Sequence, residues 1–269
     1  MSTPSLDPEE LRQVASSFGV DAAYDRARPR YPDALITAIA DAARDGASGP
    51  APRVLDVGVG TGIVARQLRA AGCAVLGVDV DERMAEVARG DGLEVEVARF
   101  EEWEPAGRTF DAVTAGQTWH WVDPDAGAAR AADVLRPGGV LTVFWNAGDP
   151  PPELATAFAQ VYRDVLPGSP LAATSTASAE TAYRQMIAAA ADGIRGTGRF
   201  AEPRERRDAW ERTYTRDEWL SLVPTTGVAT RLPAAQLDAL LAGLGAAIDA
   251  AGGSFVQQGF TLAVDAVRV

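Results

Sequence analysis

The chain has 269 residues, of which 47% are hydrophobic, and a formal net charge of −12 at pH 7. This length suffices for one large α/β domain, or for one domain with a sizeable insertion. The acidic balance argues against a nucleic-acid partner, because proteins that bind phosphate backbones concentrate positive charge. The single cysteine, Cys73, excludes an internal disulfide and argues against a cysteine-based zinc site. We predict no metal site, and a buried position for Cys73.

The N-terminal stretch carries acids at Asp7, Glu9 and Glu10, where a secretion signal would carry basic residues. No window approaches 18 uninterrupted apolar residues, the length that a membrane-spanning helix needs. The sequence therefore predicts neither a signal peptide nor a membrane span, and we expect a cytoplasmic protein.

Residues 1–52 read as an N-terminal helical segment. Asp7 followed by Pro8 begins a predicted helix over residues 7–17. Two X-Pro steps then interrupt the helical pattern, and a second helix is expected from about residue 32 to 44. A Gly/Ser/Pro-rich linker leads into the first strand.

The central motif is Asp56-Val57-Gly58-Val59-Gly60-Thr61-Gly62, between an apolar strand over 53–57 and an amphipathic helix over 63–71. The loop therefore lies where a strand turns directly into the N-terminus of a helix. Glycines at this point let the backbone approach a ligand closely, with dihedral angles that a Cβ would disfavour.

The glycine spacing departs from two better-known nucleotide motifs. After Gly58 and Gly60, a dinucleotide-binding fingerprint needs a glycine where this chain has Ile63. The chain has no lysine, which excludes a phosphate-binding P-loop. The carboxylate of Asp56, placed directly before the glycines, suits a ligand with a positive group, and S-adenosylmethionine carries an ammonium, a sulfonium, a ribose and no phosphate.

A second predicted strand, residues 74–78, ends at Asp79, about 20 residues after the first glycine. An acid at that spacing is expected to accept hydrogen bonds from ribose hydroxyls. We include the following residue, Val80, in the same predicted cofactor site.

Three further strands complete a βαβ pattern, at 93–97, 110–115 and 140–145, with helices begun by Asp81 and Asp123. Five strands alternating with helices predict a doubly wound parallel sheet. Ligands bind outside the carboxyl ends of such strands, so Gln117 and His120 should share an edge of the sheet with Asp56 and Asp79.

After residue 146 the pattern changes to helices and long loops. A capping box at Thr215 opens one helix, and an apolar face of leucines predicts another. The expected elements are helices over 152–166, 179–192, 215–224 and 233–251 and strands over 204–214 and 260–269.

The motif Asp56-x-Gly58-x-Gly60-x-Gly62 resembles motif I of the class I S-adenosylmethionine-dependent methyltransferases. Residues 24–32, 117–121 and 135–139 look like the type 11 branch that includes trans-aconitate methyltransferases. The resemblance implies an α/β fold with a Rossmann-like, doubly wound seven-stranded sheet, mostly parallel with an antiparallel last strand, and a helical cap insertion. It divides the chain into a flap at 1–52, a cofactor-binding core at 53–147, an acceptor cap at 148–200 and a completion of the sheet at 201–269.

The resemblance also implies roles for residues outside the glycine loop. In the related enzymes the N-terminal segment closes over the cofactor, which points to Tyr24 and Arg28; the alternative is that this segment packs on the core through its aromatic side chains. The turn after the third strand holds the adenine in the family, which points to Phe100 and Glu101; the alternative is that Phe100 and Trp103 pack the turn. The predicted cofactor-binding set is Asp56, Gly58, Gly60, Gly62, Asp79, Val80, Phe100, Glu101, Gln117, Tyr24 and Arg28.

The predicted function is methyl transfer from S-adenosylmethionine to a small-molecule acceptor, either the carboxylate of an organic acid or a hydroxyl of a metabolite. A hydroxyl acceptor benefits from a base, and His120, the only histidine, is the candidate; the alternative is a ring fixed between the flanking tryptophans. A carboxylate needs no base and would pair with Arg28, Arg195 or Arg199. The alternatives are a non-catalytic S-adenosylmethionine-binding protein and an NAD-dependent oxidoreductase. The sequence leaves the oligomeric state open.

Overall fold

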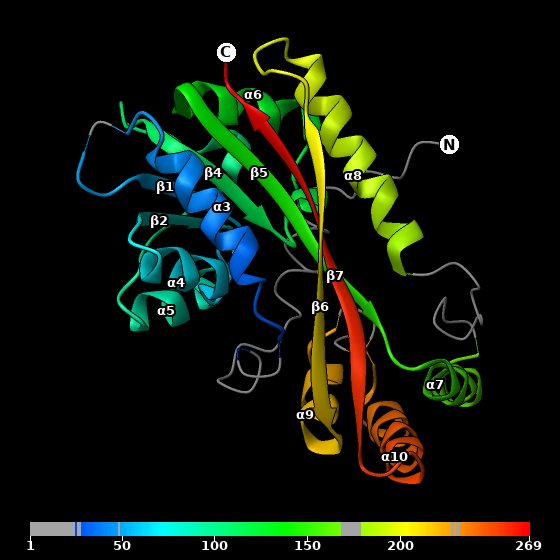
Figure 1. Ribbon diagram of the computed structural model, residues 1–269. Helices are drawn as coiled ribbons and strands as arrows, with labels where there is room; N and C mark the ends of the chain where they lie inside the picture. Colours follow the sequence, from blue (N-terminus) through cyan, green and yellow to red (C-terminus); the bar gives the residue numbers. More distant parts are fainter. Residues whose placement is uncertain (1–24, 26–27, 48, 168–178, 227–228, 230–231) are drawn as a thin grey trace. The chain divides into compact units, whose positions relative to one another are not determined.

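The computed structural model describes residues 25, 28–47, 49–167, 179–226, 229 and 232–269. The predicted helix at 7–17 and Tyr24 lie outside these residues. The described part contains a seven-stranded sheet with helices along it (Figure 1).

The strand order is β3-β2-β1-β4-β5-β7-β6. Strands β1 to β5 pair in parallel, and β7 runs in the opposite direction to β5 (Figure 1). This confirms the predicted Rossmann-like α/β sheet with an antiparallel last strand. The strands are β1 (Arg53–Val57), β2 (Ala74–Asp79), β3 (Glu94–Val97), β4 (Phe110–Gly116), β5 (Leu135–Asp149), β6 (Arg204–Thr215) and β7 (Ser254–Val267).

The helices begin where local sequence signals place them. Asp81 and Asp123 accept hydrogen bonds from backbone amides of the first helical turn, and Thr215 forms the predicted capping box with Glu218. The helices are α3 (Asp33–Arg44), α4 (Ile63–Ala70), α5 (Glu82–Gly90), α6 (Pro124–Val134), α7 (Pro152–Val165), α8 (Ala179–Gly196), α9 (Arg216–Leu222) and α10 (Ala234–Ala250), with 3₁₀ turns η1 (Phe100–Glu102), η2 (Trp119–Trp121) and η4 (Val223–Thr225).

The chain divides into two compact units. The sheet unit comprises Arg30–Asn146, Tyr183–Asp208 and Thr261–Val269. The helical unit comprises Met1–Pro29, Ala147–Ala182 and Ala209–Phe260. Because β5, β6 and β7 each contribute to both units, this division falls at other positions than the sequence-based boundaries. The assignment of flap, cofactor core and acceptor cap stays a prediction.

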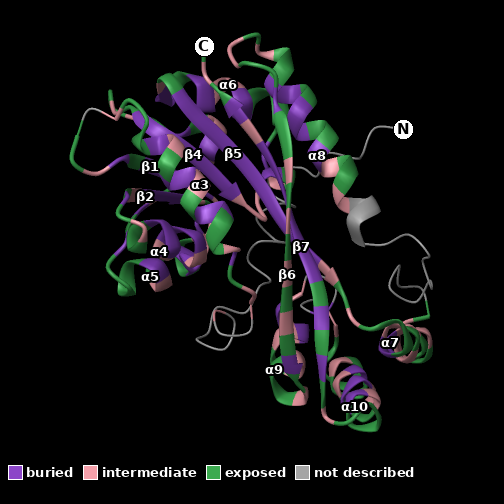
Figure 2. Ribbon diagram, viewed as in Figure 1, coloured by how far each residue is buried: buried purple, intermediate pink, exposed green. Residues whose placement is uncertain are grey.

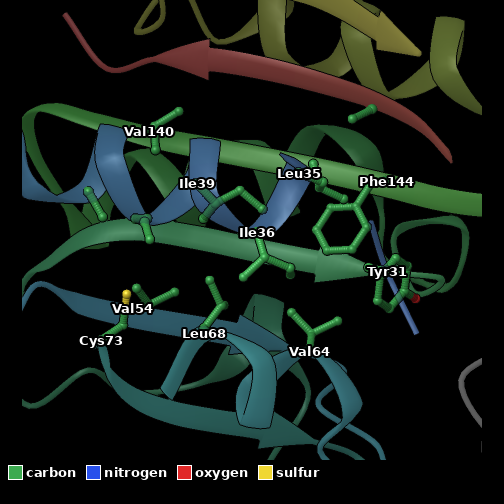
Figure 3. Packing of buried hydrophobic residues seen from close by; sticks show 14 residues of the cluster. Tyr31, Leu35, Ile36, Ile39, Val54, Val64, Leu68, Cys73, Val140 and Phe144 are labelled. Carbon is green, nitrogen blue, oxygen red and sulfur yellow. The ribbon is translucent and has the colours of Figure 1, made fainter. Parts of the chain in front are cut away.

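The core of the sheet unit lies between its strands and the helices α3 and α4 (Figure 3). Leu35 and Ile39 of α3 and Leu68 of α4 pack against β1, β4 and β5, whose central residues are buried (Figure 2). Phe144 of β5 meets the ring of Tyr31 edge-on, with 4.8 Å between centroids. Burying each such side chain stabilises the fold by about 1.5–3 kcal/mol, so this cluster holds the carboxyl edge of the sheet rigidly.

The helical unit has a separate aromatic core. Trp219 of α9 stacks on Phe158 of α7 at 5.7 Å and meets Phe255 of β7 edge-on at 5.1 Å. The predicted apolar face of α10 faces this cluster, with Leu240 and Leu244 buried. Each unit therefore buries its own set of apolar side chains.

Three elements extend well beyond their predicted ends. Strand β5 spans Leu135–Asp149, although the sequence predicted residues 140–145. Helix α8 runs to Gly196 although the glycines from residue 193 predict an earlier stop. A Cβ at Gly193 would lie 2.6 Å from the carbonyl oxygen of Pro124, so this glycine permits close packing against α6. Strand β7 begins at Ser254 rather than residue 260.

Candidate active site

Asp56 lies near the end of β1, opposite Thr114 of the neighbouring strand β4. Its side chain is buried, and the Thr114 hydroxyl donates to Oδ1 at 2.9 Å. The other oxygen, Oδ2, is buried without a hydrogen-bond partner in the part of the chain that the structure describes. Burial, followed by the nearby charge of Asp79, raises the pKa of Asp56 to about 7. A buried carboxyl with one unpaired oxygen favours a positively charged group beside it.

The glycine loop leaves no room for a side chain at its first position. Gly58 has φ +64°, and a Cβ there would lie 2.1 Å from Cγ2 of Thr118. At the N-terminus of α4, Gly62 has φ +93°, and a Cβ would lie 2.4 Å from Leu93. Gly60 also has a positive φ, of +55°, but a more open surrounding. The predicted need for glycine thus has a steric cause at residues 58 and 62.

Asp79 ties the end of β2 to this loop. Its Oδ2 accepts from the backbone N–H of Gly60 at 2.7 Å, and its Oδ1 from that of Asp81 at 2.9 Å. Burial raises the pKa of Asp79, and these hydrogen bonds act in the opposite direction. The next residue, Val80, keeps 43% of its surface exposed. Asp79 therefore fixes the loop, and whether it also accepts from a ribose stays a prediction.

Gln117 and Thr118 follow β4 at the same edge of the sheet. Gln117 has φ +56°, an uncommon value for a residue with a side chain, and its Nε2 donates to the Asn146 carbonyl at 2.8 Å. The Thr118 hydroxyl lies within hydrogen-bond distance of two carbonyls, Gly58 at 3.2 Å and Gly116 at 3.1 Å. The loops after β1 and β4 are therefore held together.

Asn146 is part of the edge, and sequence reasoning missed it. Its Oδ1 accepts from the Thr261 hydroxyl at 2.5 Å, and its Nδ2 donates to the Arg30 carbonyl at 3.4 Å. Together with Gln117, these bonds connect β4, β5, β7 and the segment before α3. The available signal was a polar residue directly after the apolar strand 140–145.

His120, on η2, has one defined hydrogen-bond partner. The indole Nε1 of Trp145 lies 3.2 Å from Nδ1 of His120. The His120 ring also packs on Trp121, with 4.6 Å between centroids, whereas Trp119 is buried and packs near Phe100. Although part of His120 is exposed, protein atoms crowd its ring and lower its pKa to about 4. The ring thus has Trp121 beside it, as the alternative expected, and Trp145 as its hydrogen-bond partner.

Phe100 and Glu101 have partners within the protein. Phe100 is buried, with its ring centroid 6.3 Å from that of Trp119. Glu101 accepts from the backbone N–H of Asp123 at 3.0 Å and lies 3.5 Å from the guanidinium of Arg99. Trp103, which the alternative pairs with Phe100 in packing the turn, is also buried, and an adenine contact stays a prediction.

The arginines considered for a carboxylate ligand all have partners. Arg28, in the helical unit, donates to the carbonyl of Thr225 at 2.7 Å. Arg195 forms ion pairs with Asp192 and Glu202, and Arg199 with Asp133. A role for Arg28 toward the cofactor stays a prediction.

The described residues also bear on other kinds of site. Histidine, cysteine and acidic side chains do not gather there in groups of three or more that could hold a metal ion. No helix in the described part of the chain is long and apolar enough to cross a membrane.

Residues 54–139 match the methyltransferase domain family. An uncharacterized methyltransferase of Mycobacterium tuberculosis is 40% identical over 142 residues, which cover 51% of this chain and 55% of the relative. A malonyl-[acyl-carrier protein] O-methyltransferase of Enterobacter lignolyticus is 36% identical over 161 residues, 57% of this chain and 61% of that protein. A ubiquinone biosynthesis O-methyltransferase of Aromatoleum aromaticum is 38% identical over 96 residues, 32% of this chain and 41% of that protein. The chain thus spans less than two thirds of the length of each of these relatives.

A solved structure supports the fold over nearly the whole chain. A protein of Anaeromyxobacter dehalogenans, assigned to the type II methyltransferases, superposes with a TM-score of 0.55 and 25% sequence identity. The superposition covers 90% of this chain and 97% of that one. The family match spans β1 to the start of β5, the segment that holds Asp56, the glycine loop and Asp79. Residues 54–139 therefore form a class I S-adenosylmethionine-dependent methyltransferase domain.

Proposed function

We propose that the protein transfers the methyl group of S-adenosylmethionine to an oxygen atom of a small-molecule acceptor. The observation that carries this proposal is the buried carboxyl of Asp56, with Oδ2 unpaired among the described residues, beside a glycine loop that excludes side chains at Gly58 and Gly62. When bound, the cofactor supplies a methyl group attached to a sulfonium sulfur. The sulfur departs as a neutral thioether, which is a good leaving group.

The residues of the edge fit the groups of this cofactor. Asp56 suits the ammonium, because a positive charge there would pair with Oδ2 and draw the pKa of the carboxyl down. Asp79, which lies at the end of β2 next to the exposed Val80, suits the ribose hydroxyls. Thr114 positions Asp56, whereas Thr118 and Asn146 hold Gly58 and Gln117 at the same edge of the sheet. Most of the rate enhancement would then come from holding the two reactants in alignment.

Two observations support a small-molecule acceptor that is methylated on oxygen: the net charge of the chain and the named activities of two relatives. A chain with a net charge of −12 and no lysine offers little to a phosphate backbone, which favours a small molecule over RNA or DNA. The two relatives of named activity are O-methyltransferases, one named for malonyl-[acyl-carrier protein] and one for ubiquinone biosynthesis. Oxygen, in a carboxylate or a hydroxyl, is therefore the acceptor atom that we propose.

Calorimetry tests the cofactor assignment. S-adenosylhomocysteine should bind and NADH should not, and Asp79→Ala should weaken binding by about 1.5–3 kcal/mol, the range for hydrogen bonds to a charged group. Asp91→Ala supplies the control, because Asp91 is an exposed acid paired with Arg66. Binding of NADH in place of S-adenosylhomocysteine would contradict the proposal.

Proton release tests the place of Asp56. At pH 7 a carboxyl of pKa about 7 is about half protonated. An ammonium bound beside it should expel that proton, so the binding enthalpy should depend on the ionisation enthalpy of the buffer and should lose this dependence in Asp56→Asn. Transfer of tritiated methyl groups to a panel of small carboxylic acids and phenols then tests turnover. Binding without transfer to any acceptor in the panel or in metabolite extracts would favour the non-catalytic alternative.

A further inference from the structure

The hydrogen bond between Trp145 and His120 has a fixed direction. An indole N–H donates and cannot accept, so Nδ1 of His120 must be the acceptor in the 3.2 Å contact. Turning the imidazole by 180° would place the carbon Cδ2 against the indole N–H, and carbon offers no lone pair. Trp145 is buried in β5, so its ring is held in place by the core.

This direction determines where the imidazole carries its proton. A neutral imidazole has one N–H and one lone pair, and the lone pair here lies on Nδ1. The proton is therefore on Nε2. The lowered pKa of His120, about 4, comes from crowding by protein atoms, and charged side chains among the described residues are not among its causes. The ring is neutral at pH 7, and neither nitrogen has a lone pair free for a substrate proton.

We propose that His120 donates a hydrogen bond from Nε2–H to an acceptor that arrives as a carboxylate, and that His120 is not a general base. This inference rests on the proposed methyl transfer and names its substrate class. His120 is exposed as a residue and follows β4 at the same edge of the sheet as Gln117, so a ligand bound at that edge can approach it.

A neutral imidazole that can donate a hydrogen bond but cannot take a proton favours a carboxylate as the acceptor. A carboxylate is already ionised at pH 7, whereas a hydroxyl acceptor benefits from a base, and His120 is the only histidine. One carboxylate oxygen accepts from Nε2–H while a lone pair of the other attacks the methyl carbon. The carbon–oxygen bond forms, the carbon–sulfur bond breaks and the sulfur keeps that electron pair. The products are an ester and a neutral thioether, and no proton is transferred.

Nitrogen NMR tests the direction of the hydrogen bond without requiring activity. Because the chain has one histidine, protein labelled with ¹⁵N-histidine gives one imidazole and needs no assignment. We expect the Nε2–H tautomer, without titration between pH 5.5 and 8.5. In Trp145→Phe both tautomers should become populated. An Nδ1–H tautomer in the wild type, or a pKa near 6–7, would overturn the proposal. This NMR measurement needs no cofactor. A failure of this proposal can therefore be told apart from a failure of S-adenosylhomocysteine to bind.

Transfer assays test the acceptor class. With tritiated S-adenosylmethionine and matched panels of carboxylic acids and phenols, we expect the wild type to methylate acids. His120→Ala should lower kcat/KM about 10- to 100-fold, the range for a hydrogen bond to a charged group. His120→Gln keeps an N–H donor and should retain more activity than His120→Ala. At saturating S-adenosylmethionine, where the bound ammonium keeps Asp56 ionised, the rate should not titrate between pH 6 and 8.5. Methylation of phenols only, with a rate that follows a pKa near 6–7 and equal losses in both variants, would overturn the proposal.

Discussion

Two buried aspartates on neighbouring strands differ in how their carboxylates are satisfied. Asp111, near the start of β4, accepts from the backbone N–H of Arg53 and from Nε of Arg136, both at 2.7 Å. Asp56, near the end of β1, accepts from Thr114, and its Oδ2 has no partner among the described residues. The strands pair in parallel, so the two acids lie toward opposite edges of one sheet.

The difference separates a structural acid from one suited to a ligand. At the amino edge Asp111 joins β1 to the segment after α6 through a guanidinium that neutralises it. At the carboxyl edge burial raises the pKa of Asp56 to about 7, because the hydroxyl of Thr114 and the backbone of Ala65 offset it only in part. Both acids are buried, and the guanidinium beside Asp111 is the partner that distinguishes them.

Replacing Asp56 should have the largest effect on the pH dependence of stability. The folded pKa of about 7 exceeds the ordinary value of 3.8, so the folded state holds more protons between pH 4 and 7. The free energy of unfolding should therefore fall as the pH rises through that window, by about 4 kcal/mol in total. Asp56→Asn should remove this loss, which urea unfolding at pH 4.5 and 8 would measure. An unchanged pH slope would contradict the assigned environment.

Removing the partner of Asp111 tests the other side of the comparison. Arg136→Met leaves a largely buried carboxylate without its guanidinium, and breaking a buried pair costs about 3 kcal/mol. Thermal and urea unfolding should show this loss. The affinity for S-adenosylhomocysteine, measured at a temperature where the variant is folded, should not change. If Arg136→Met were as stable as the wild type but no longer bound S-adenosylhomocysteine, Asp111 would belong to the cofactor site instead.

The glycine loop offers a matched pair of substitutions. Gly58 and Gly60 both have positive φ, so an alanine at either position costs about 1–2 kcal/mol of backbone strain. At Gly58 the methyl would also overlap Thr118, whereas the position of Gly60 is open. Gly58→Ala should therefore destabilise the protein by about 2 kcal/mol more than Gly60→Ala. Adding Thr118→Ala to Gly58→Ala should recover part of that difference; equal costs in the two single variants would argue against a close contact between Gly58 and Thr118.

The smallest effect is expected at a surface ion pair. Arg199 and Asp133 lie 2.6 Å apart but both are exposed, and such pairs contribute about 0–1 kcal/mol. Arg199→Met should thus leave stability nearly unchanged, as the control for Arg136→Met. It should also leave kcat/KM unchanged, and a raised KM for an acidic acceptor would return Arg199 to the substrate site.

Local signals in the sequence predicted much of the sheet unit. The strands from β1 to β5 follow apolar runs bounded by turn residues, and the caps Asp81, Asp123 and Thr215 bond to amides within the next turn. The glycine loop was also recognisable from the spacing of its glycines, although the side chains that exclude a Cβ there, Thr118 and Leu93, are distant in the sequence.

Contacts between distant residues could not be read in this way. Thr114 meets Asp56 across 58 positions, and Thr261 meets Asn146 across 115. Both pairs depend on the register between strands, which a local sequence pattern does not predict. The prediction that a helix ends at the glycine of residue 193 was wrong for the same reason, since its partner Pro124 lies on another helix.

The place of Cys73 gives the protein a practical property. It is the only cysteine, it lies in the core cluster of the sheet unit, and burial raises the pKa of its thiol (Figure 3). Because the reactive species is the thiolate, thiol-specific labelling reagents should not react with Cys73 in the folded protein. One cysteine added to the surface of each unit would then carry the probes, and a distance measured between them would report the arrangement of the units in solution.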